Sequence, residues 1–323
     1  MKIKKKTFLI TGSAGFIGFH LSKKLLELGH NIYGIDNLDD YYDPKIKIDR
    51  NKILKKFSNY IFYKYDLCKI ENLSINKIDI IIHFAAQPGI HLSEDNREKY
   101  FNNNILASFK LLEFMKKNNL KKIIYASSSS VYSGNNNKVN SEHDSLNIEK
   151  NFYATTKKIN ETLISYYQKK GISSIGLRFF TVFGPFGRPD MLMSKIMSAY
   201  KNNSNLKLYN NGNNKRDFTF IDDAIKSTHK ILENFIKEDK IKQNIFNIGF
   251  GKSVTVKEVI SIFEKNLDFK FKKKLLPSNS YENLISLANT LKFEDSFGTF
   301  YPNDLEYGIR EYITWYKNYY KIK

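Results

Sequence analysis

The stretch Thr7-Phe-Leu-Ile-Thr-Gly-Ser-Ala-Gly-Phe-Ile-Gly18 decides the fold of this chain. It begins as a short apolar strand, continues into a glycine-rich turn and ends where a helix starts. Gly12 allows a tight turn, Gly15 lets the backbone approach a pyrophosphate closely, and Gly18 lets the helix pack against the strand. The helix N-terminus then offers unpaired N–H groups and the positive end of its dipole to phosphate. The pattern therefore predicts a dinucleotide-binding turn after the first strand.

An acidic residue at the end of the next strand strengthens this interpretation. A second strand is predicted over residues 31–35, and Asp36 ends it. A carboxylate at this point accepts hydrogen bonds from both ribose hydroxyls and repels a 2′-phosphate. The glycines alone are weak support, because turns are glycine-rich by default. Strand, turn, helix and acid together predict a site for NAD rather than NADP.

The composition limits the class of protein. A chain of 323 residues buries a full core, as one large domain or two smaller ones. The single cysteine, Cys68, excludes an intramolecular disulfide framework and fits a reducing compartment, so we expect a cytoplasmic protein. No apolar run has the length needed to cross a bilayer, and we expect no membrane partner.

The net charge of +19 raises the hypothesis of nucleic-acid binding. The basic residues are dispersed along the whole chain, however, and neither a zinc-ligand spacing nor a basic stripe with interleaved aromatic residues occurs. We therefore expect no nucleic-acid partner and no bound metal. A basic surface would instead suit anionic substrates that carry phosphate.

Strand and helix patterns alternate through the first half of the chain. Further strands are predicted over residues 60–65, 78–84, 122–126 and 172–180. Helices are predicted over 19–28 and 153–170, and another helix is predicted to run through Asn104 and Leu112. This alternation predicts an α/β fold with a doubly wound parallel sheet that binds ligands at the carboxyl ends of its strands. We predict a cofactor domain over residues 1–180 and a mainly substrate-binding region over 181–323. Parts of 217–249 are expected to pack on the first domain.

Two further strand ends offer candidate cofactor contacts. Asp66 follows the third predicted strand, where it suits either a hydrogen bond to adenine or the cap of a turn. Ala85, Ala86 and Gln87 close the fourth strand, and the small residues there let a cofactor lie across the sheet edge. We expect His83, inside that apolar strand, to be packed and to have no catalytic role.

Tyr153 and Lys157 provide a candidate general base. Four residues apart on a predicted helix, they lie on the same face. A neighbouring ammonium stabilises the phenolate and lowers the tyrosine pKa from about 10 towards neutrality, where it acts as a base. Ser128, at the carboxyl end of strand 122–126, either hydrogen-bonds the same substrate hydroxyl or only caps its turn.

In this order the motifs resemble the extended short-chain dehydrogenase/reductase family of NAD-dependent epimerases and dehydratases, over nearly the whole chain. The segments are most similar to the branch that epimerises UDP-glucuronate at C4. The carrying segments are TGSAGFIGFH (11–20), GIDNLDDYYD (34–43), HFAAQPGI (83–90), YASSSSVY (125–132), LRFFTVFGPFGRPDM (177–191) and KRDFTFIDD (215–223). The resemblance implies a homodimer that converts UDP-glucuronate to UDP-galacturonate through a transient 4-keto sugar.

The resemblance also implies roles for individual residues. Tyr153 is the implied base, Lys157 contacts the nicotinamide ribose and the tyrosine, and Ser128 contacts the sugar hydroxyl. The implied NAD-binding set is Gly12, Gly15, Phe16, Ile17, Gly18, Asp36, Asn37, Asp66, Leu67, Ala85, Ala86, Gln87, Asn104, Tyr153, Lys157 and Phe180. The implied substrate-binding set is Ser127, Ser128, Thr181, Arg188 and Arg216, with Arg216 on the diphosphate.

Two departures from the family pattern leave the sugar open. His91 stands where the family usually has arginine, and Ser280-Tyr-Glu282 stands where it usually has Pro-Gly-Asp. A UDP-N-acetylhexosamine or UDP-hexose 4-epimerase is therefore an alternative. A nucleotide-sugar 4,6-dehydratase is disfavoured, because the segment Ser128–Ser130 lacks the carboxylates of that group. A non-catalytic NAD-responsive binding protein is disfavoured because the Tyr153/Lys157 pair is present.

Overall fold

The computed structural model describes residues 4–75, 77–90, 93–134, 139–146, 150–237, 244–278, 284–299 and 301–322. The chain divides into two compact units, each assembled from three separate stretches. The first unit comprises Met1–Val131, Asn151–Arg178 and Ser227–Phe246, and the second comprises Tyr132–Lys150, Phe179–Lys226 and Asn247–Lys323. None of the helices in the described stretches is both long enough and apolar enough to cross a membrane.

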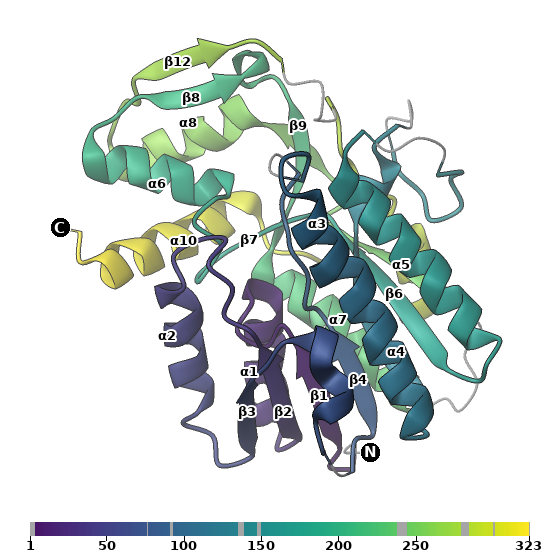
Figure 1. The fold of residues 1–323 in the computed structure, drawn as a ribbon. Coiled ribbons are helices and arrows are strands. Elements are labelled where there is room, and N and C mark those ends of the chain that lie inside the picture. Colours follow the sequence, from purple (N-terminus) through teal and green to yellow (C-terminus); the bar gives the residue numbers. More distant parts are fainter. Residues whose placement is uncertain are drawn as a thin grey trace. The chain divides into compact units, whose positions relative to one another are not determined.

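A parallel sheet of seven strands organises the first unit (Figure 1). Its order is β10-β6-β5-β4-β1-β2-β3. The strands are β1 (Thr7–Thr11), β2 (Asn31–Asp36), β3 (Tyr60–Lys64), β4 (Ile80–His83), β5 (Lys122–Ser128), β6 (Ser173–Phe179) and β10 (Asn244–Ile248). Strand order reverses between β1 and β4, and a reversal of this kind opens a crevice for ligands at the carboxyl ends of the strands. The predicted doubly wound α/β fold is confirmed.

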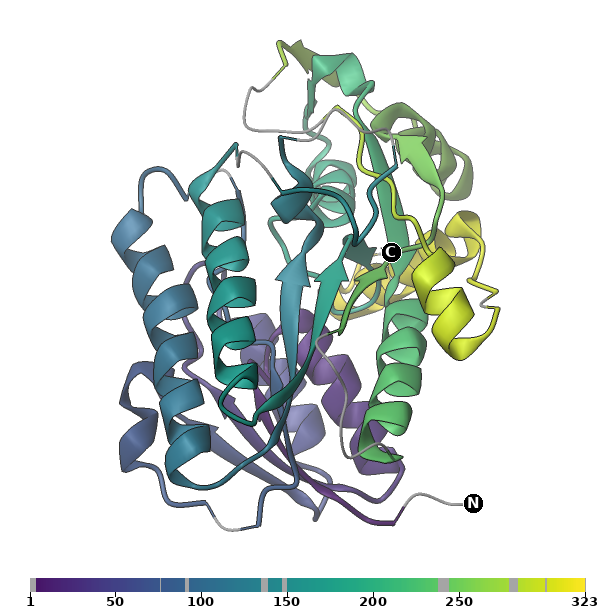
Figure 2. The same cartoon turned by 90° about the vertical axis from the view of Figure 1, so that its right-hand side faces the viewer.

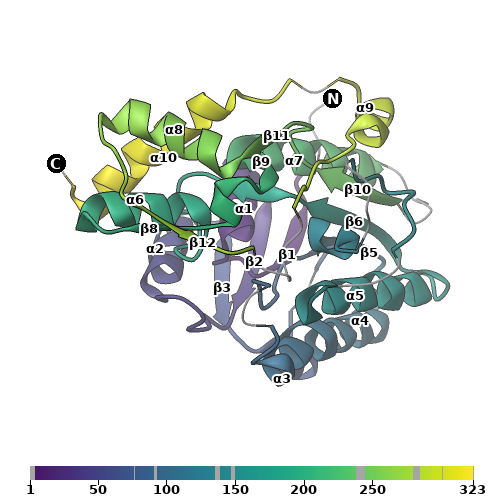
Figure 3. The same cartoon turned by 90° about the horizontal axis from the view of Figure 1, so that it is seen from above.

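Helices cover both faces of this sheet (Figures 2 and 3). Helices α1 (Phe16–Glu27) and α7 (Ile221–Lys237) lie on one face, and α4 (Ala107–Lys117) and α5 (Phe152–Gln168) lie on the other. Leu9 and Ile81, on central strands, and Leu111, on α4, are completely buried. Strands covered on both faces are expected to be apolar along their length, which explains the continuous apolar runs in the sequence.

The ends of α1 and α5 follow from their sequences. Gly29 adopts a φ of +85° just beyond α1, a conformation that glycine accepts without strain. Asn151 caps α5, because its Oδ1 accepts a hydrogen bond from Ala154 N at 2.9 Å. This cap starts the helix at Phe152 and therefore places Tyr153 in its first turn.

A short helical segment between β4 and α4 departs from the sequence expectation. A regular helix was expected to run through Asn104, but α3 (Arg97–Tyr100) passes into a π-helix, η2 (Phe101–Leu106), before α4 begins. Bulges of this type are frequent at functional sites. The remaining elements of the first unit are α2 (Lys45–Leu54) and the 3₁₀ helix η1 (Leu67–Asn72).

The second unit contains two small sheets and four helices in its described residues. One sheet has the order β11-β9-β7, and the other pairs β12 with β8. The strands are β7 (Thr181–Phe183), β8 (Leu206–Tyr209), β9 (Lys215–Phe220), β11 (Ser253–Thr255) and β12 (Lys273–Leu276); the helices are α6 (Leu192–Asn202), α8 (Val256–Leu267), α9 (Leu291–Phe297) and α10 (Leu305–Tyr320). A short 3₁₀ turn, η4 (Asn210–Gly212), follows β8, and another, η3 (Ser129–Tyr132), follows β5 at the end of the first stretch of the first unit.

A buried carboxylate joins three segments of the second unit. Asp217, on β9, has no exposed surface. It accepts hydrogen bonds from the backbone N–H groups of Phe250 at 2.7 Å, Gly251 at 2.9 Å and Ala288 at 3.1 Å. These bonds hold β9, and with it the neighbouring Arg216, against two loops distant in sequence.

Candidate active site

Only glycine fits at three positions of the turn after β1. A Cβ built at Gly12, whose φ is +71°, would lie 2.6 Å from Ala85 N. A Cβ at Gly15 would lie 2.9 Å from Gly12 O, and one at Gly18 would lie 2.1 Å from the same oxygen. Gly15 is also the N-cap of α1 and has no side chain to cap the first N–H groups. The turn is therefore a close-fitting backbone cradle that suits a pyrophosphate.

Asp36 lies buried at the end of β2, beside this turn. Its Oδ2 accepts from Ala14 N at 3.1 Å and its Oδ1 from Leu38 N at 2.8 Å. Burial raises the pKa of the carboxyl, while the Lys47 ammonium and the two N–H donors oppose this rise. The carboxylate is thus fixed in orientation next to the glycine turn, as the ribose contact predicted from the sequence requires.

Two cations of α2 support the same corner of the sheet. Arg50 has no exposed surface, and its Nη1 donates to Ala14 O at 2.9 Å and to Tyr42 Oη at 3.2 Å. Lys47 Nζ donates to Asp39 O at 2.6 Å. Neither role could be predicted from the sequence, because a basic residue in a polar, lysine-rich stretch gives no signal that it is buried.

Replacement of Asp36 by Ala is expected to weaken NAD and to improve NADP. The variant loses a charged acceptor for the ribose hydroxyls and keeps the field of Lys47 and Arg50, which favours a 2′-phosphate. Hydrogen bonds to a charged group contribute about 1.5–3 kcal/mol each, so we expect NAD affinity to fall at least tenfold. Calorimetric titration with both dinucleotides measures this change.

Asp39→Ala is the matched control for this prediction. Asp39 lies in the same loop, and its carboxylate likewise accepts a backbone N–H, from Tyr41 at 2.9 Å. It should change the preference between the dinucleotides little. Equal affinity of the unaltered protein for NAD and NADP would refute the assignment of Asp36.

The other predicted cofactor residues lie at the start of α1, at η1 and just after strands β2 and β4. Phe16 and Ile17 form the first turn of α1, and Leu67 is buried in η1. Asp66 caps η1 by accepting from Cys68 N at 2.9 Å, which is the turn-cap alternative left open by the sequence. Asn37 similarly accepts from Asp39 N at 3.0 Å. Ala85 and Ala86 are half-buried after β4.

Tyr153 and Lys157 share one face of α5. Lys157 Nζ lies 5.9 Å from the centroid of the Tyr153 ring and donates to Ala126 O at 3.0 Å. Burial lowers the pKa of the Lys157 ammonium to about 8, and the Glu161 carboxylate opposes this shift. The Tyr153 ring also packs edge-to-face against Tyr100, at 6.3 Å between centroids. A phenol held beside an ammonium in this way suits proton transfer.

The serines at the end of β5 are engaged within the chain. Ser128 Oγ accepts from Ser130 N at 3.1 Å and lies 3.1 Å from Ser130 Oγ, so it does cap its own turn. Ser127 is buried, and its Oγ donates to Glu161 Oε1 at 2.6 Å. Their direct contact with substrate stays a prediction, and Ser128 is the more accessible of the two.

Asn104 links the π-helix η2 to the loop after β4 and to α5. Its Oδ1 accepts from Gln87 N at 2.6 Å, while its Nδ2 donates to Gln87 O at 3.1 Å and to Thr156 Oγ1 at 2.9 Å. Both amide hydrogens are therefore used inside the protein. The π-helix brings this side chain into reach, and Asn104 orients the segment that carries the predicted cofactor residue Gln87.

His83 is packed, as expected from the sequence. Its Nδ1 lies 2.8 Å from Thr11 Oγ1, and its Nε2 lies 3.0 Å from Ser108 Oγ, which itself donates to Asn104 O. Burial lowers the pKa of His83 to about 3, with the Lys157 cation acting in the same direction. The imidazole is thus neutral and joins β1, β4 and α4.

The predicted substrate residues Thr181, Arg188 and Arg216 lie in the second unit. Thr181 begins β7 and is half-buried. The guanidinium of Arg188 forms two hydrogen bonds with the Asp190 carboxylate, through Nε at 3.0 Å and through Nη2. Arg216 Nη1 donates to Lys215 O at 2.9 Å. Phe180, predicted near the cofactor, is buried, and its ring lies 6.2 Å from that of Tyr132.

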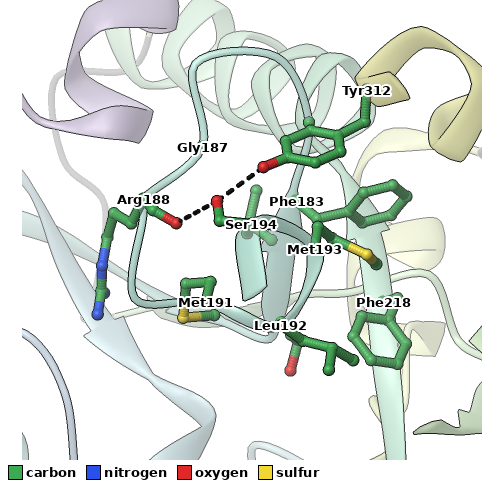
Figure 4. Close-up of a pocket in the computed structure, with 12 residues that line it drawn as sticks. Phe183, Gly187, Arg188, Met191, Leu192, Met193, Ser194, Phe218 and Tyr312 are labelled. Atoms are coloured by element: carbon green, nitrogen blue, oxygen red, sulfur yellow. Dashed lines mark hydrogen bonds between the residues drawn. The ribbon is translucent and has the colours of Figure 1, made fainter. Parts of the chain in front are cut away.

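A small, largely apolar pocket has Thr181 and Arg188 in its lining. Figure 4 shows how its walls are held: Ser194 Oγ donates to Arg188 O at 2.8 Å, and the Tyr312 hydroxyl lies 2.7 Å from Ser194 Oγ. Because Ser194 gives its proton to Arg188 O, Tyr312 donates to Ser194. The pocket is lined by Thr181, Val182, Phe183, Gly184, Gly187, Arg188, Met191, Leu192, Met193, Ser194, Phe218 and Tyr312.

His91 and the segment Ser280–Glu282, which leave the choice of sugar open, lie outside the described residues. Within the described stretches, no three His, Cys, Asp or Glu side chains gather into a group able to hold a metal ion.

Comparison with known proteins places these features in context. Residues 8–249 match the sequence profile described as the NAD dependent epimerase/dehydratase family. An uncharacterised protein of Methanocaldococcus jannaschii is 40% identical over 321 residues, covering 97% of each chain. The UDP-glucuronate 4-epimerase of Thermodesulfobacterium geofontis is 32% identical over 318 residues, covering 96% of each. The solved structure of the Bacillus cereus UDP-glucuronic acid 4-epimerase with UDP-glucuronic acid and NAD has a TM-score of 0.89 at 31% identity, covering 97% of this chain and 100% of that chain.

Proposed function

The chain belongs to the NAD dependent epimerase/dehydratase family, and we propose that it is an NAD-dependent UDP-sugar 4-epimerase that converts UDP-glucuronate to UDP-galacturonate. The observation that carries the proposal is the Tyr153/Lys157 pair on α5, in the same unit as the glycine turn and Asp36. The names of the Thermodesulfobacterium and Bacillus relatives support UDP-glucuronate as the substrate.

The first unit has the residues to hold NAD. The N-terminus of α1 and the glycine turn would bind the pyrophosphate, Asp36 the adenosine ribose, and Lys157 the nicotinamide ribose. NAD⁺ supplies a carrier that accepts the C4 hydride and later returns it. Because nothing is consumed in this cycle, we expect the cofactor to be held tightly through many turnovers.

Residues of the chain transfer the proton of the C4 hydroxyl. Tyr153, as a phenolate stabilised by the Lys157 ammonium, takes the proton of the C4 hydroxyl, and Ser128 orients that hydroxyl. After the 4-keto sugar has turned over, Tyr153 would return the proton to the C4 oxygen. In the second unit, Arg216 would bind the diphosphate and Arg188 would belong to the substrate loop.

A panel of UDP-sugars tests the proposal. The purified protein is incubated with UDP-glucuronate, UDP-glucose and UDP-N-acetylglucosamine, and the products are separated and identified by NMR. We expect C4 epimerisation to be fastest with UDP-glucuronate. Faster turnover of UDP-N-acetylglucosamine would refute UDP-glucuronate as the substrate and favour the alternative, a UDP-N-acetylhexosamine 4-epimerase. We also propose that the protein is a cytoplasmic homodimer. Sedimentation equilibrium measures the mass of the assembly and so tests the dimer.

Thr181 would restrain the carboxylate of this substrate. The 4-keto form of a uronate is a β-keto acid, which loses CO₂ most readily when the breaking bond lies perpendicular to the ketone plane. The enzyme must hold the carboxylate away from that geometry without a strong cationic anchor that would prevent the ring from turning over. A hydroxyl donor such as Thr181, with backbone N–H groups, suits this task, whereas the Ser127 hydroxyl already donates to Glu161.

Thr181→Val is therefore expected to slow epimerisation and to raise the fraction of decarboxylated pentose product. The substitution keeps the β-branched shape in β7 and removes the hydroxyl. Product ratios from the NMR assay give the result, with Thr162→Val, an exposed α5 threonine whose hydroxyl bonds Lys158 O at 3.2 Å, as the control. An unchanged product ratio would leave Thr181 with only a structural role at the strand end.

A further inference from the structure

A buried ion pair lies beside the catalytic face of α5. Glu161 and Arg178, on α5 and β6, are only 6% and 3% exposed. Arg178 donates from Nε to Glu161 Oε1 at 2.9 Å and from Nη2 to Oε2 at 2.8 Å. Burying two charges costs a large desolvation free energy, so such a pair is a poor source of stability. Its place next to the site therefore suggests a role in the reaction.

The pair is connected to the strand end that carries Ser128. Tyr153, Lys157 and Glu161 follow one another at four-residue spacing, on one face of α5. Lys157 Nζ donates to Ala126 O at 3.0 Å, and Ser127 Oγ donates to Glu161 Oε1 at 2.6 Å. Two successive residues of β5 are thus bound to the helix face, immediately before Ser128.

The charges around Lys157 come from three elements. On α5 these are the Tyr153 phenol and the Glu161 carboxylate, and on β6 the Arg178 guanidinium acts through Glu161. On β4, His83 is neutral above about pH 3 and adds no charge in the working range. Burial favours loss of the Lys157 proton, and Glu161 opposes that loss.

We propose that Glu161, restrained by Arg178, is a positioning residue that holds the end of β5 against α5 and keeps Lys157 protonated beside Tyr153. This inference rests on the proposed function, because it assumes that Tyr153 is the base. Arg178 has a second effect, since it partly neutralises Glu161 and limits how strongly the carboxylate acts on Lys157.

The two halves of the pair should shift the pH profile of turnover in opposite directions. The high-pH limb reports loss of the Lys157 proton. Glu161→Gln keeps an acceptor for Ser127 but removes the negative charge, so the limb should move to lower pH by about one unit. Arg178→Met leaves the Glu161 charge unneutralised, so the limb should move to higher pH. A merely structural disturbance would lower activity without moving the limb in opposite directions.

A titration independent of turnover separates this inference from the proposed function. In protein labelled with ¹³C at lysine Cε, the Lys157 resonance is identified by its absence in Lys157→Met. A titration near pH 8 distinguishes it from exposed lysines, which titrate near about 10.4. The same opposite shifts are expected here. If the protein converts no UDP-sugar, the proposed function is refuted. The Lys157 titration can still be measured, because it does not depend on turnover.

Two further variants complete the test. Removing one partner of a buried pair can prevent folding, but the double variant Glu161→Gln/Arg178→Met has no unpaired charge. Its Lys157 should titrate below that of the unaltered protein, by less than in Glu161→Gln alone. Glu113→Gln is the matched control. Glu113 accepts a hydrogen bond from the Tyr167 hydroxyl, and Tyr167 lies about 15 Å along α5 from Lys157, so this variant should leave the Lys157 pKa unchanged. An unmoved Lys157 titration in both Glu161→Gln and the double variant would overturn the inference.

Discussion

Tyr153→Phe is expected to lower the rate of epimerisation by a factor of about 10²–10⁴, the usual contribution of a general base. The substitution removes one oxygen atom. It retains the ring that packs against Tyr100 and lies over Lys157 Nζ, so the start of α5 should keep its structure. We therefore expect bound NAD and the unfolding temperature to remain close to those of the unaltered protein. Initial rates with UDP-glucuronate, NAD content by absorbance and a thermal melt measure the three quantities.

Tyr166→Phe is the control for this variant. Tyr166 lies on the same helix, and 55% of it is exposed. It loses the same atom away from the face that carries Lys157 and should retain full activity. If Tyr153→Phe turned over at nearly the original rate, Tyr153 would not be the base and the proposed mechanism would fail.

Gly18→Ala is expected to abolish tight NAD binding. Alanine is favoured over glycine inside a helix by about 1 kcal/mol, so helix propensity alone predicts a stabilised protein. The close contacts predict the opposite, because the new Cβ would lie 2.1 Å from Gly12 O and 2.9 Å from Gly12 C. Both atoms belong to the backbone of the turn, which would have to open. Overpacking of this kind typically costs about 1–3 kcal/mol of stability, and here it also displaces the cradle.

NAD content after purification and calorimetric titration measure this effect. Gly29→Ala is the control at the other end of α1. No atom lies within 4 Å of a Cβ built there, although the φ of +85° makes alanine strained. That variant should lose some stability and keep NAD. Unimpaired NAD binding in Gly18→Ala would show that the turn adapts and that its glycines are not required.

The parts of the fold that depend on local patterns were predicted correctly. Six of the seven parallel strands, the turn after β1 and the helix carrying Tyr153 follow from apolar runs, glycines and four-residue spacing, which are local properties of the sequence. The seventh strand, β10, was not predicted as a strand. The strand limits differ by a few residues. Strand β5, for example, continues to Ser128, whereas the sequence placed the turn from Ser127 onward.

The parts that depend on contacts between distant residues were not predicted. Arg50 and Glu161 are charged residues on helices, and charged helical residues are usually exposed, so neither pattern indicated that they are buried. Arg178 did give a signal, because a charge inside an apolar strand implies a buried partner. The identity of that partner could not be read from one sequence. Asn104 in the π-helix η2 likewise bonds to Gln87 and Thr156, which are distant from it in the sequence.

The division of the chain into interleaved stretches has a consequence for how the protein folds as it is synthesised. Strand β6 ends at Phe179, but its neighbour β10 starts at Asn244, and the first unit ends only at Phe246. At a synthesis rate of about 5–20 residues per second, roughly 3–13 seconds pass between the synthesis of β6 and that of β10, the strand that pairs with it. During that interval the nascent chain presents an unpaired, apolar edge, which is a template for aggregation. The last strand of the sheet, rather than its nucleotide-binding turn, therefore sets the period in which the growing chain most needs a chaperone.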